Sequence, residues 1–478
     1  MSLRAIGRSM WFWLGLVLMT WSSADAVWAQ SPDRLPSGLT IDHAIQFGLD
    51  HYPSVRVALA RVEAAKSGID LTRTAYLPRV EMGFQQNMGT FNKASGVFFM
   101  TPYTPPIWGR QGDGVSYRGA WGSAAGTMAA WEPFDFGLRN ANVEAARAAE
   151  RQTAAGVTLT QLDVGLGVGD AFFMVLMAQQ TVEAMKGNVE RRRVFSDTVN
   201  VLVKNGLRPG VDASRALAEL AMARTQLIQA EQAEGIARAT LAEVLGAAGE
   251  QFDIRPGPLM TLPGSSRLPE PAPWAHPLAV AQKATADVFQ KRKEALDRAW
   301  VPRFDLMAGF SSRGSSWERN GNREPGYGGL FPDVPNWVGG WTMSFQLFDF
   351  ASIRAKRLTE EHNQQAELAA YDQVIQALTG KHFKAVETVK GANRIAENTP
   401  IQLTAARDTE VQARARYQTG LATVVEVAEA QQLVVQASID DALARLGVWR
   451  SILGLAGARG DLGLFLNLVR SSTGQRNP

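Results

Sequence analysis

Cysteine is absent from this chain of 478 residues. Its absence excludes disulfide bonds, a thiol nucleophile, thiolate metal sites and a lipid attached to an N-terminal cysteine. The five histidines are scattered and form neither His-Glu-x-x-His nor another metal-ligand spacing, so no metal site is predicted. A Gly-x-Gly-x-Gly run at 165–169 lies within a predicted helix with no strand before it, which argues against a dinucleotide site. We therefore expect no enzyme and no cofactor.

A strong charge of either sign is also lacking. The net charge is +3 and both signs are mixed along the chain, so nothing indicates nucleic-acid binding. The expected N-terminal signal peptide, residues 1–29, has Arg4 and Arg8 before a short apolar run and small-residue cleavage sites ending at Ala26 and Ala29. No later apolar run approaches twenty residues, so we expect no transmembrane helix. Any membrane-spanning part must then consist of strands.

The most informative feature is a motif that occurs twice. Phe134-Asp135-Phe136 recurs as Phe348-Asp349-Phe350 at an offset of 348 − 134 = 214, and Leu77-Pro78-Arg79 recurs as Val301-Pro302-Arg303 at 302 − 78 = 224. Shared offsets over this distance indicate an internal two-fold repeat with an insertion or deletion between the landmarks. The predicted organisation is a signal peptide (1–29), repeat 1 (30–249), a Pro/Gly-rich linker (250–275), repeat 2 (276–457) and a C-terminal tail (458–478).

Each repeat contains two segments in which apolar and polar residues alternate. In the clearest one, Trp341, Met343 and Phe345 take one face while Thr342 and Ser344 take the other. Such a strand suits a position between lipid and a watery lumen, and a strand of a soluble sandwich is the alternative. Aromatic residues near the strand ends are typical of an interfacial girdle, with buried core aromatics as the alternative. The predicted strands are 80–88, 121–133, 303–312 and 337–347.

Long helical runs follow the repeated motif. The first long helix, 137–204, would span roughly 100 Å at 1.5 Å per residue, and the second is predicted at 351–417. Apolar residues at seven-residue spacing favour coiled-coil-like packing. Both helices end in aligned glycine turns, at 420 − 206 = 214, and the return helices are predicted at 210–245 and 424–455.

These elements together predict a mixed α/β membrane protein that acts as a conduit. Four strands are too few to close a barrel, and an open sheet edge is not tolerated in lipid, so several copies must pool their strands. Helices of roughly 100 Å would then project far from the membrane as a tube. A periplasmic coiled-coil scaffold or adaptor without a barrel is the alternative, but it would not explain four amphipathic strands.

Nearly all of the chain after the signal peptide resembles the TolC-type outer-membrane efflux protein family. The resemblance rests on Leu39-Thr-Ile-Asp-His-Ala, the two proline motifs, the repeated Phe-Asp-Phe, and Tyr417-Gln-Thr-Gly420 followed by Glu426 and Glu429. It implies a homotrimer in the outer membrane of a Gram-negative bacterium, in which four transmembrane strands per protomer complete a twelve-stranded barrel that continues as an α-helical periplasmic tunnel. It also implies docking of a periplasmic adaptor (membrane fusion protein) and an inner-membrane RND, ABC or MFS-type transporter. The implied function is the exit duct of a tripartite efflux or type I secretion system.

The resemblance also implies an acidic ring at the periplasmic entrance. The family's ring residues match Glu426 and Glu429, which are three residues apart and therefore share a helix face. Threefold symmetry would gather six carboxylates, which favour cations. The alternative is that Glu426 only completes a capping box with Thr423 while Glu429 is merely solvated.

Other entrance positions follow from the same resemblance. Tyr417 and Asp212 match a hydrogen-bonded latch that holds the family's entrance shut. A second latch uses an arginine where this chain has Ala422, so that latch is not expected here. The tips that adaptors grip match Gly206 with Leu207 and Gly420 with Leu421.

Overall fold

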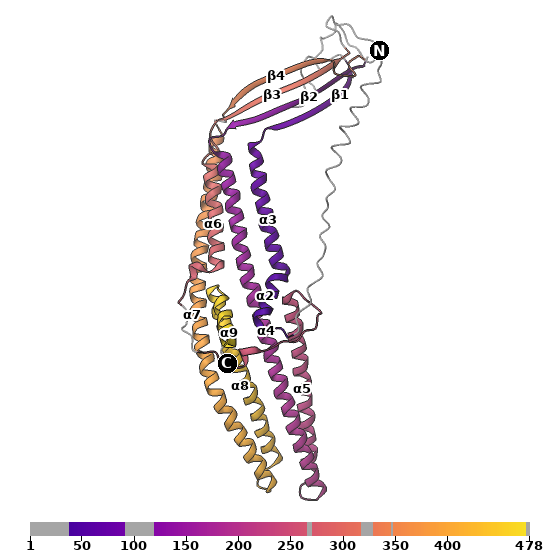
Figure 1. Ribbon diagram of the computed structural model, residues 1–478, viewed down its shortest axis with the longest axis vertical. Helices are drawn as coiled ribbons and strands as arrows, with labels where there is room; N and C mark the ends of the chain where they lie inside the picture. The colour runs from indigo at the N-terminus through magenta and orange to yellow at the C-terminus, as the bar shows by residue number, and fades with distance from the viewer. Residues whose placement is uncertain (1–37, 91–118, 265–269, 317–327, 346–347, 475–478) are drawn as a thin grey trace.

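The computed structural model describes residues 38–90, 119–264, 270–316, 328–345 and 348–474. The predicted signal peptide and the end of the predicted strand 337–347 lie outside this range. The molecule is long and narrow: a curved sheet forms one end, and two helical hairpins form the other (Figure 1). The elements in chain order are α2 (Ile41–His51), α3 (Pro53–Arg73), η1 (Thr74–Tyr76), β1 (Arg79–Thr90), β2 (Gly119–Phe134), α4 (Leu138–Lys204), α5 (Gly210–Leu245), η2 (Gly257–Met260), η3 (Pro273–Ala275), α6 (Pro277–Leu296), β3 (Arg303–Ser315), β4 (Val334–Ser344), α7 (Asp349–Gln418), α8 (Val424–Arg459) and α9 (Gly463–Gly474).

The four strands form one antiparallel sheet in the order β1-β2-β3-β4. Residues opposite each other in neighbouring strands share a face, and the register aligns the apolar positions: Trp131 lies opposite Leu306, which lies opposite Trp341. We call this side the apolar face. Its apolar and small members are Val80, Met82, Phe84, Met88, Trp121, Ala125, Ala129, Trp131, Phe304, Leu306, Ala308, Phe310, Trp337, Gly339, Trp341 and Met343, and the polar residues Gln86, Ser123, Thr127 and Ser312 share this face.

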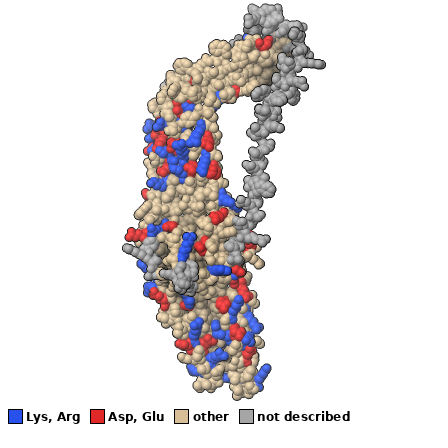
Figure 2. All heavy atoms as spheres, viewed as in Figure 1, with Lys and Arg blue, Asp and Glu red and all other residues tan. Residues whose placement is uncertain are grey.

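The opposite side of the sheet carries mostly polar or small residues. Asp305 lies opposite Thr342, and Met128, Met307, Val334 and Val338 are the large apolar exceptions among the paired positions. The predicted alternation holds best in β1, β3 and β4, with Met343 on one face and Thr342 on the other, whereas β2 up to Trp131 carries small residues on both faces apart from its Trp and Met side chains. On the apolar face Met82 is 86% exposed and Trp337 84% exposed in the single chain, which is unusual for a protein surrounded only by water. Figure 2 shows few charged side chains over the sheet and many over the helices.

The first copy of Phe-Asp-Phe turns the chain from β2 into α4 through a buried polar network. Asp135 accepts hydrogen bonds from the backbone N–H groups of Gly137 and Arg139 and forms an ion pair with the Arg139 guanidinium at 3.0 Å. That guanidinium also donates to the carbonyl oxygens of Ala75 (3.2 Å) and Glu132 (2.6 Å). Arg139 is only 7% exposed, and its contacts to Ala75 and Glu132 join η1, β2 and α4.

The two copies of the motif differ in their backbone conformation. In the first copy, Phe136 (φ 50°) and Gly137 (φ 87°) adopt left-handed backbone conformations that let the chain turn before α4 begins. The counterpart of Gly137 is Ala351, and a side chain disfavours that conformation. The helix α7 instead starts at Asp349, three residues earlier than the alignment of the repeats predicts (349 against 138 + 214 = 352). Asp349 is exposed, and no ion pair joins it to another described residue.

Two very long helices carry the structure away from the sheet. The helix α4 has 67 residues and α7 has 70, which corresponds to roughly 100 Å each. Each folds back on its return helix, α4 on α5 and α7 on α8, while α3 and α6 pack beside their upper halves (Figure 1). The predicted long and return helices are therefore present, and α7 continues through Pro400.

The main hydrophobic core lies midway along the molecule, where both halves of the chain meet. Phe172 and Phe173 of α4, Trp449 of α8 and Phe465 of α9 are completely buried there. Two glycines of the Gly-x-Gly-x-Gly run serve packing at this core: a Cβ atom would lie 2.7 Å from the Leu453 side chain at Gly169, and Gly165 lies directly against Leu462. These two glycines allow close helix packing.

Two sequence-based expectations need correction. The segment 458–478 is not a simple tail, because it contains α9. The centroid of its Phe465 ring lies 6.1 Å from that of Phe173 and 6.3 Å from that of Trp449. The linker 250–275 is partly structured: Ile254 forms a parallel β-bridge with Leu39, and Leu259 is fully buried. A stretch of α4 has the length and apolar composition of a membrane span, but half of it is buried, so its apolar character reflects core packing.

Candidate functional site

The two hairpin tips lie at the end of the molecule opposite the sheet (Figure 1). Both turns have the same geometry: Gly206 (φ 72°) and Gly420 (φ 83°) adopt the left-handed conformation that ends a helix. The N–H of Leu207 donates to Leu202 O, and that of Leu421 donates to Arg416 O, each at 2.9 Å. Both leucine side chains are about 70% exposed, at 68% and 71%. The four residues predicted as adaptor-docking tips therefore form matched, exposed apolar points.

The predicted acidic pair occupies the first turns of α8. Thr423 Oγ1 accepts the N–H of Glu426 (3.3 Å), and Glu426 Oε1 accepts the N–H of Thr423 (3.1 Å), so the capping box is formed. Glu429 is exposed, as is Glu426, and neither forms an ion pair with a described residue. The capping role of Glu426 is therefore real, but it leaves both negative charges open to solvent. Whether they form a ring stays a prediction.

An apolar cluster joins the two tips. Tyr417, at the end of α7, is 1% exposed, and its ring centroid lies 5.3 Å from that of Phe195 on α4. The other buried members of this tip cluster are Val199, Ala216, Ala422, Val424 and Val427. Ala422 is thus a packing residue at the position where the family resemblance leads one to look for an arginine.

The structure brings the predicted latch residues Tyr417 and Asp212 close together. Burial raises the pKa of the Tyr417 hydroxyl, the Asp212 carboxylate raises it further, and the Arg208 guanidinium opposes this. The hydroxyl is enclosed and makes no hydrogen bond to a described residue. The Asp212 carboxylate therefore acts on the hydroxyl first through its charge and to a smaller extent through a weak side-chain interaction, and the latch stays a prediction.

Arg208, which the sequence did not single out, makes the direct polar contact between the tips. Its Nη2 donates to Tyr417 O at 2.6 Å, and its Cζ lies 4.4 Å from the centroid of the Tyr417 ring. Both distances are typical of strong contacts. Arg208 lies in the α4–α5 turn and is 209 residues away from Tyr417 in sequence. No local sequence pattern connects Arg208 with Tyr417, so this contact could not be predicted from the sequence.

A layer of buried polar side chains lies just above the tips. Arg192 of α4 is 4% exposed, donates to Ala428 O (3.0 Å) and lies 3.4 Å from the Glu219 carboxylate. Burial lowers the pKa of Arg192, and Glu219 partly opposes this. Asn188 and Gln431 are also buried, and their amide oxygens accept no hydrogen bond from a described residue. The α4–α8 contact is therefore polar here and apolar at the central core.

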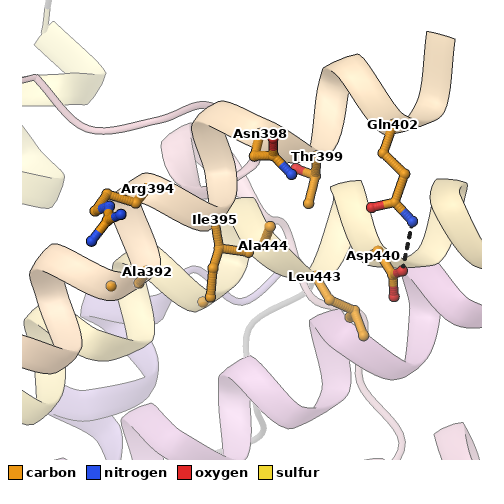
Figure 3. Close-up of a pocket in the computed structure, with 11 residues that line it drawn as sticks. Ala392, Arg394, Ile395, Asn398, Thr399, Gln402, Asp440, Leu443 and Ala444 are labelled. Carbon is orange, nitrogen blue, oxygen red and sulfur yellow. Dashed lines mark hydrogen bonds between the residues drawn. The ribbon is translucent and has the colours of Figure 1, made fainter. Parts of the chain in front are cut away.

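A groove of about 890 Å³ runs along α7 and α8 above the tips (Figure 3). Small residues, Gly391 and Ala392 on α7 and Ala444 and Gly447 on α8, leave it open. Its polar edge includes Gln402, whose Nε2 lies 3.5 Å from Asp440. No histidine lines the groove, and the Thr399 hydroxyl on its wall donates to the buried Asp441 carboxylate at 3.2 Å. Among the described residues no three His, Asp or Glu side chains are grouped as a metal site.

Comparison with known proteins gives one consistent result. The sequence model of the outer membrane efflux protein family matches residues 44–247 and 276–461. Protein CyaE of Bordetella pertussis is 26% identical over 284 residues, which cover 58% of this chain and 55% of that protein. The chain therefore spans little more than half the length of this relative.

Solved structures share the fold at low sequence identity. The structure of CusC, described with transmembrane channel formation, superimposes with a TM-score of 0.72 at 16% identity, covering 88% of this chain and 92% of that one. The Campylobacter jejuni outer membrane channel CmeC gives a TM-score of 0.70 at 13% identity, with 93% of both chains covered.

Proposed function

Because the chain belongs to the outer membrane efflux protein family, we propose that it is the outer-membrane exit duct of a tripartite efflux or type I secretion system. The duct passively conducts substrates that a periplasmic adaptor and an inner-membrane RND, ABC or MFS-type transporter deliver. The observation that carries this proposal is the sheet with one continuous, exposed apolar face, joined directly to helices of roughly 100 Å. Such a face suits lipid, and such helices can cross a periplasmic gap.

The sheet supports a trimer. The strands β1 and β4 each pair on one side only within the described chain, and unpaired edges are costly in lipid. Three copies of four strands would close a twelve-stranded barrel and satisfy every edge. Exposed apolar side chains on the long helices, such as Ile228 on α5 (64%) and Val411 on α7 (68%), supply surfaces for packing between copies. The absence of cysteine supports a duct without a lipid anchor.

The hairpin tips support the periplasmic entrance. Three copies would bring together six carboxylates from Glu426 and Glu429, which would attract cations at the mouth. Tyr417 and Asp212 lie where one tip meets the other, so this contact is suited to holding the entrance shut. Leu207 and Leu421 are the exposed points offered to an adaptor.

Planar-bilayer recording of the purified protein tests this function. Wild-type protein should produce stepwise, cation-selective currents. In a salt gradient, the reversal potential of the Glu426→Gln/Glu429→Gln variant should lie closer to zero, because its cation selectivity is reduced. The variant should remain folded, because Gln can still complete the capping box. A matched control is Glu387→Gln/Glu397→Gln, which removes two exposed charges from α7 away from the tips. Absence of any conductance would contradict the duct. Normal conductance with equal selectivity in both double variants would contradict the acidic ring alone.

A further inference from the structure

We propose that Arg208 is the residue that holds the two hairpin tips together in the closed entrance, by clamping the ring and the backbone carbonyl of Tyr417. This positioning role rests on the proposed function as a gated duct. It differs from the expected latch, in which the Tyr417 hydroxyl and Asp212 hold the entrance shut. In the structure that hydroxyl has no hydrogen-bond partner among the described residues, whereas Arg208 makes two contacts to the same tyrosine.

The carbonyl contact is favourable because of where it lies. Tyr417 O is in the last turn of α7, where helix carbonyls lack intrahelical partners and carry partial negative charge. It accepts hydrogen bonds from the N–H of Gly420 at 3.1 Å and from Arg208 Nη2 at 2.6 Å. A hydrogen bond from a charged donor is stronger than one between neutral groups.

The ring contact is favourable because water is excluded from it. Tyr417 is 1% exposed and is packed against Phe195, so the guanidinium lies on a desolvated aromatic face. Cation–π attraction is strongest in such surroundings. A planar guanidinium can stack on the ring and donate to the carbonyl at the same time, which the single ammonium of lysine cannot reproduce.

The sequence around Arg208 positions its side chain for this contact. Gly206 ends α4 in the left-handed conformation, and Pro209 follows Arg208 directly. A residue before proline is disfavoured in the helical region, so Arg208 remains in the turn and does not extend either helix. Any widening of the mouth that separates the α7–α8 tip from the α4–α5 tip must therefore break both Arg208 contacts.

Four variants of the full-length protein test the clamp in planar bilayers. Arg208→Ala should raise the ratio of open to closed time about tenfold, since it removes a charged hydrogen bond and a cation–π contact. Arg208→Lys should give an intermediate value. Arg215→Ala, which removes an exposed arginine of α5 that has no described partner, should behave like wild type. Tyr417→Phe keeps the ring and the carbonyl and removes only the hydroxyl that Asp212 acts on, so it should open the channel less than Arg208→Ala does.

A second measurement does not depend on a pore. Amide hydrogen exchange of segments 203–210 and 415–424 should accelerate about tenfold in Arg208→Ala and remain unchanged in Arg215→Ala. Arg208→Ala behaving like Arg215→Ala in both measurements would overturn the clamp, and so would Tyr417→Phe opening the channel as much as Arg208→Ala. Faster exchange in a protein that forms no pore would uphold the clamp and contradict the proposed function.

Discussion

Replacing Asp135 by asparagine is expected to destabilise the junction between β2 and α4, whereas the same change at Asp349 is not. The Asp135–Arg139 pair is nearly enclosed, with 13% and 8% of the side chains exposed, and the guanidinium depends on this carboxylate for charge compensation. Removing one partner of a buried pair costs about 3–5 kcal/mol. Asparagine keeps one acceptor oxygen, and Arg139 keeps the carbonyls of Ala75 and Glu132, so we expect about 3 kcal/mol, the lower end of that range.

The internal repeat supplies the matched control. Asp349 occupies the equivalent position but is exposed and has no described ion pair, so Asp349→Asn should change the free energy of unfolding by no more than about 0.5 kcal/mol. Urea unfolding of the detergent-solubilised protein, followed by circular dichroism at neutral pH, compares the two variants. Equal shifts would refute the reasoning, because they would show that the buried network contributes nothing beyond the charge itself.

The pH dependence gives a second check on the same network. Burial alone would raise the pKa of Asp135, but hydrogen bonds from the backbone N–H and the side chain of Arg139 outweigh it, so the pKa lies below its usual value. A lowered pKa means that the ionised carboxylate stabilises the fold above about pH 4 and that this contribution is lost as the pH falls through the folded-state value. The difference between wild type and Asp135→Asn should therefore shrink over that range.

Two further predictions concern the sheet and the central region. Ala308→Arg places a charge on the apolar face near the middle of β3 and should cost about 2–4 kcal/mol per copy in lipid. Met307→Arg places the charge on the other face and should not carry this cost. The fraction of each variant in the outer membrane measures the difference, and equal losses would contradict the assignment of faces. His276 caps α6 by accepting the Leu278 N–H on Nδ1 and contacts Gly457 O through Nε2, and its pKa is lowered by burial, partly offset by that carbonyl. Since the neutral ring is favoured in the fold, the stability should fall as the pH drops below about 6.5. In thermal unfolding scans, His276→Asn should make this fall smaller, whereas His362→Asn, at an exposed position, should leave it unchanged.

Local periodicity explains what sequence reading predicted well. All four predicted strands exist, with ends that match the predicted ones or differ from them by up to three residues, because alternation of side chains is a property of a single extended segment. The long helices and their glycine turns were predictable for the same reason, since helix formation and left-handed glycine depend on nearby residues. The helix α9 was missed because its twelve residues are short, and only Phe173 and Trp449, far away in sequence, explain why it folds.

The sequence by itself determined the two faces of the alternating strands and the positions of the tips. The different starts of α4 and α7 emerged only in the structure, where Gly137 adopts a left-handed turn that its counterpart Ala351 disfavours. Only the tertiary structure decided how those pieces combine. The strand register brought the apolar positions onto one face, and the packing of two hairpins placed Arg208 on Tyr417 across 209 residues. The physical reason is that backbone preferences act over a few residues, whereas register, burial and ion pairing depend on which distant segments share a surface.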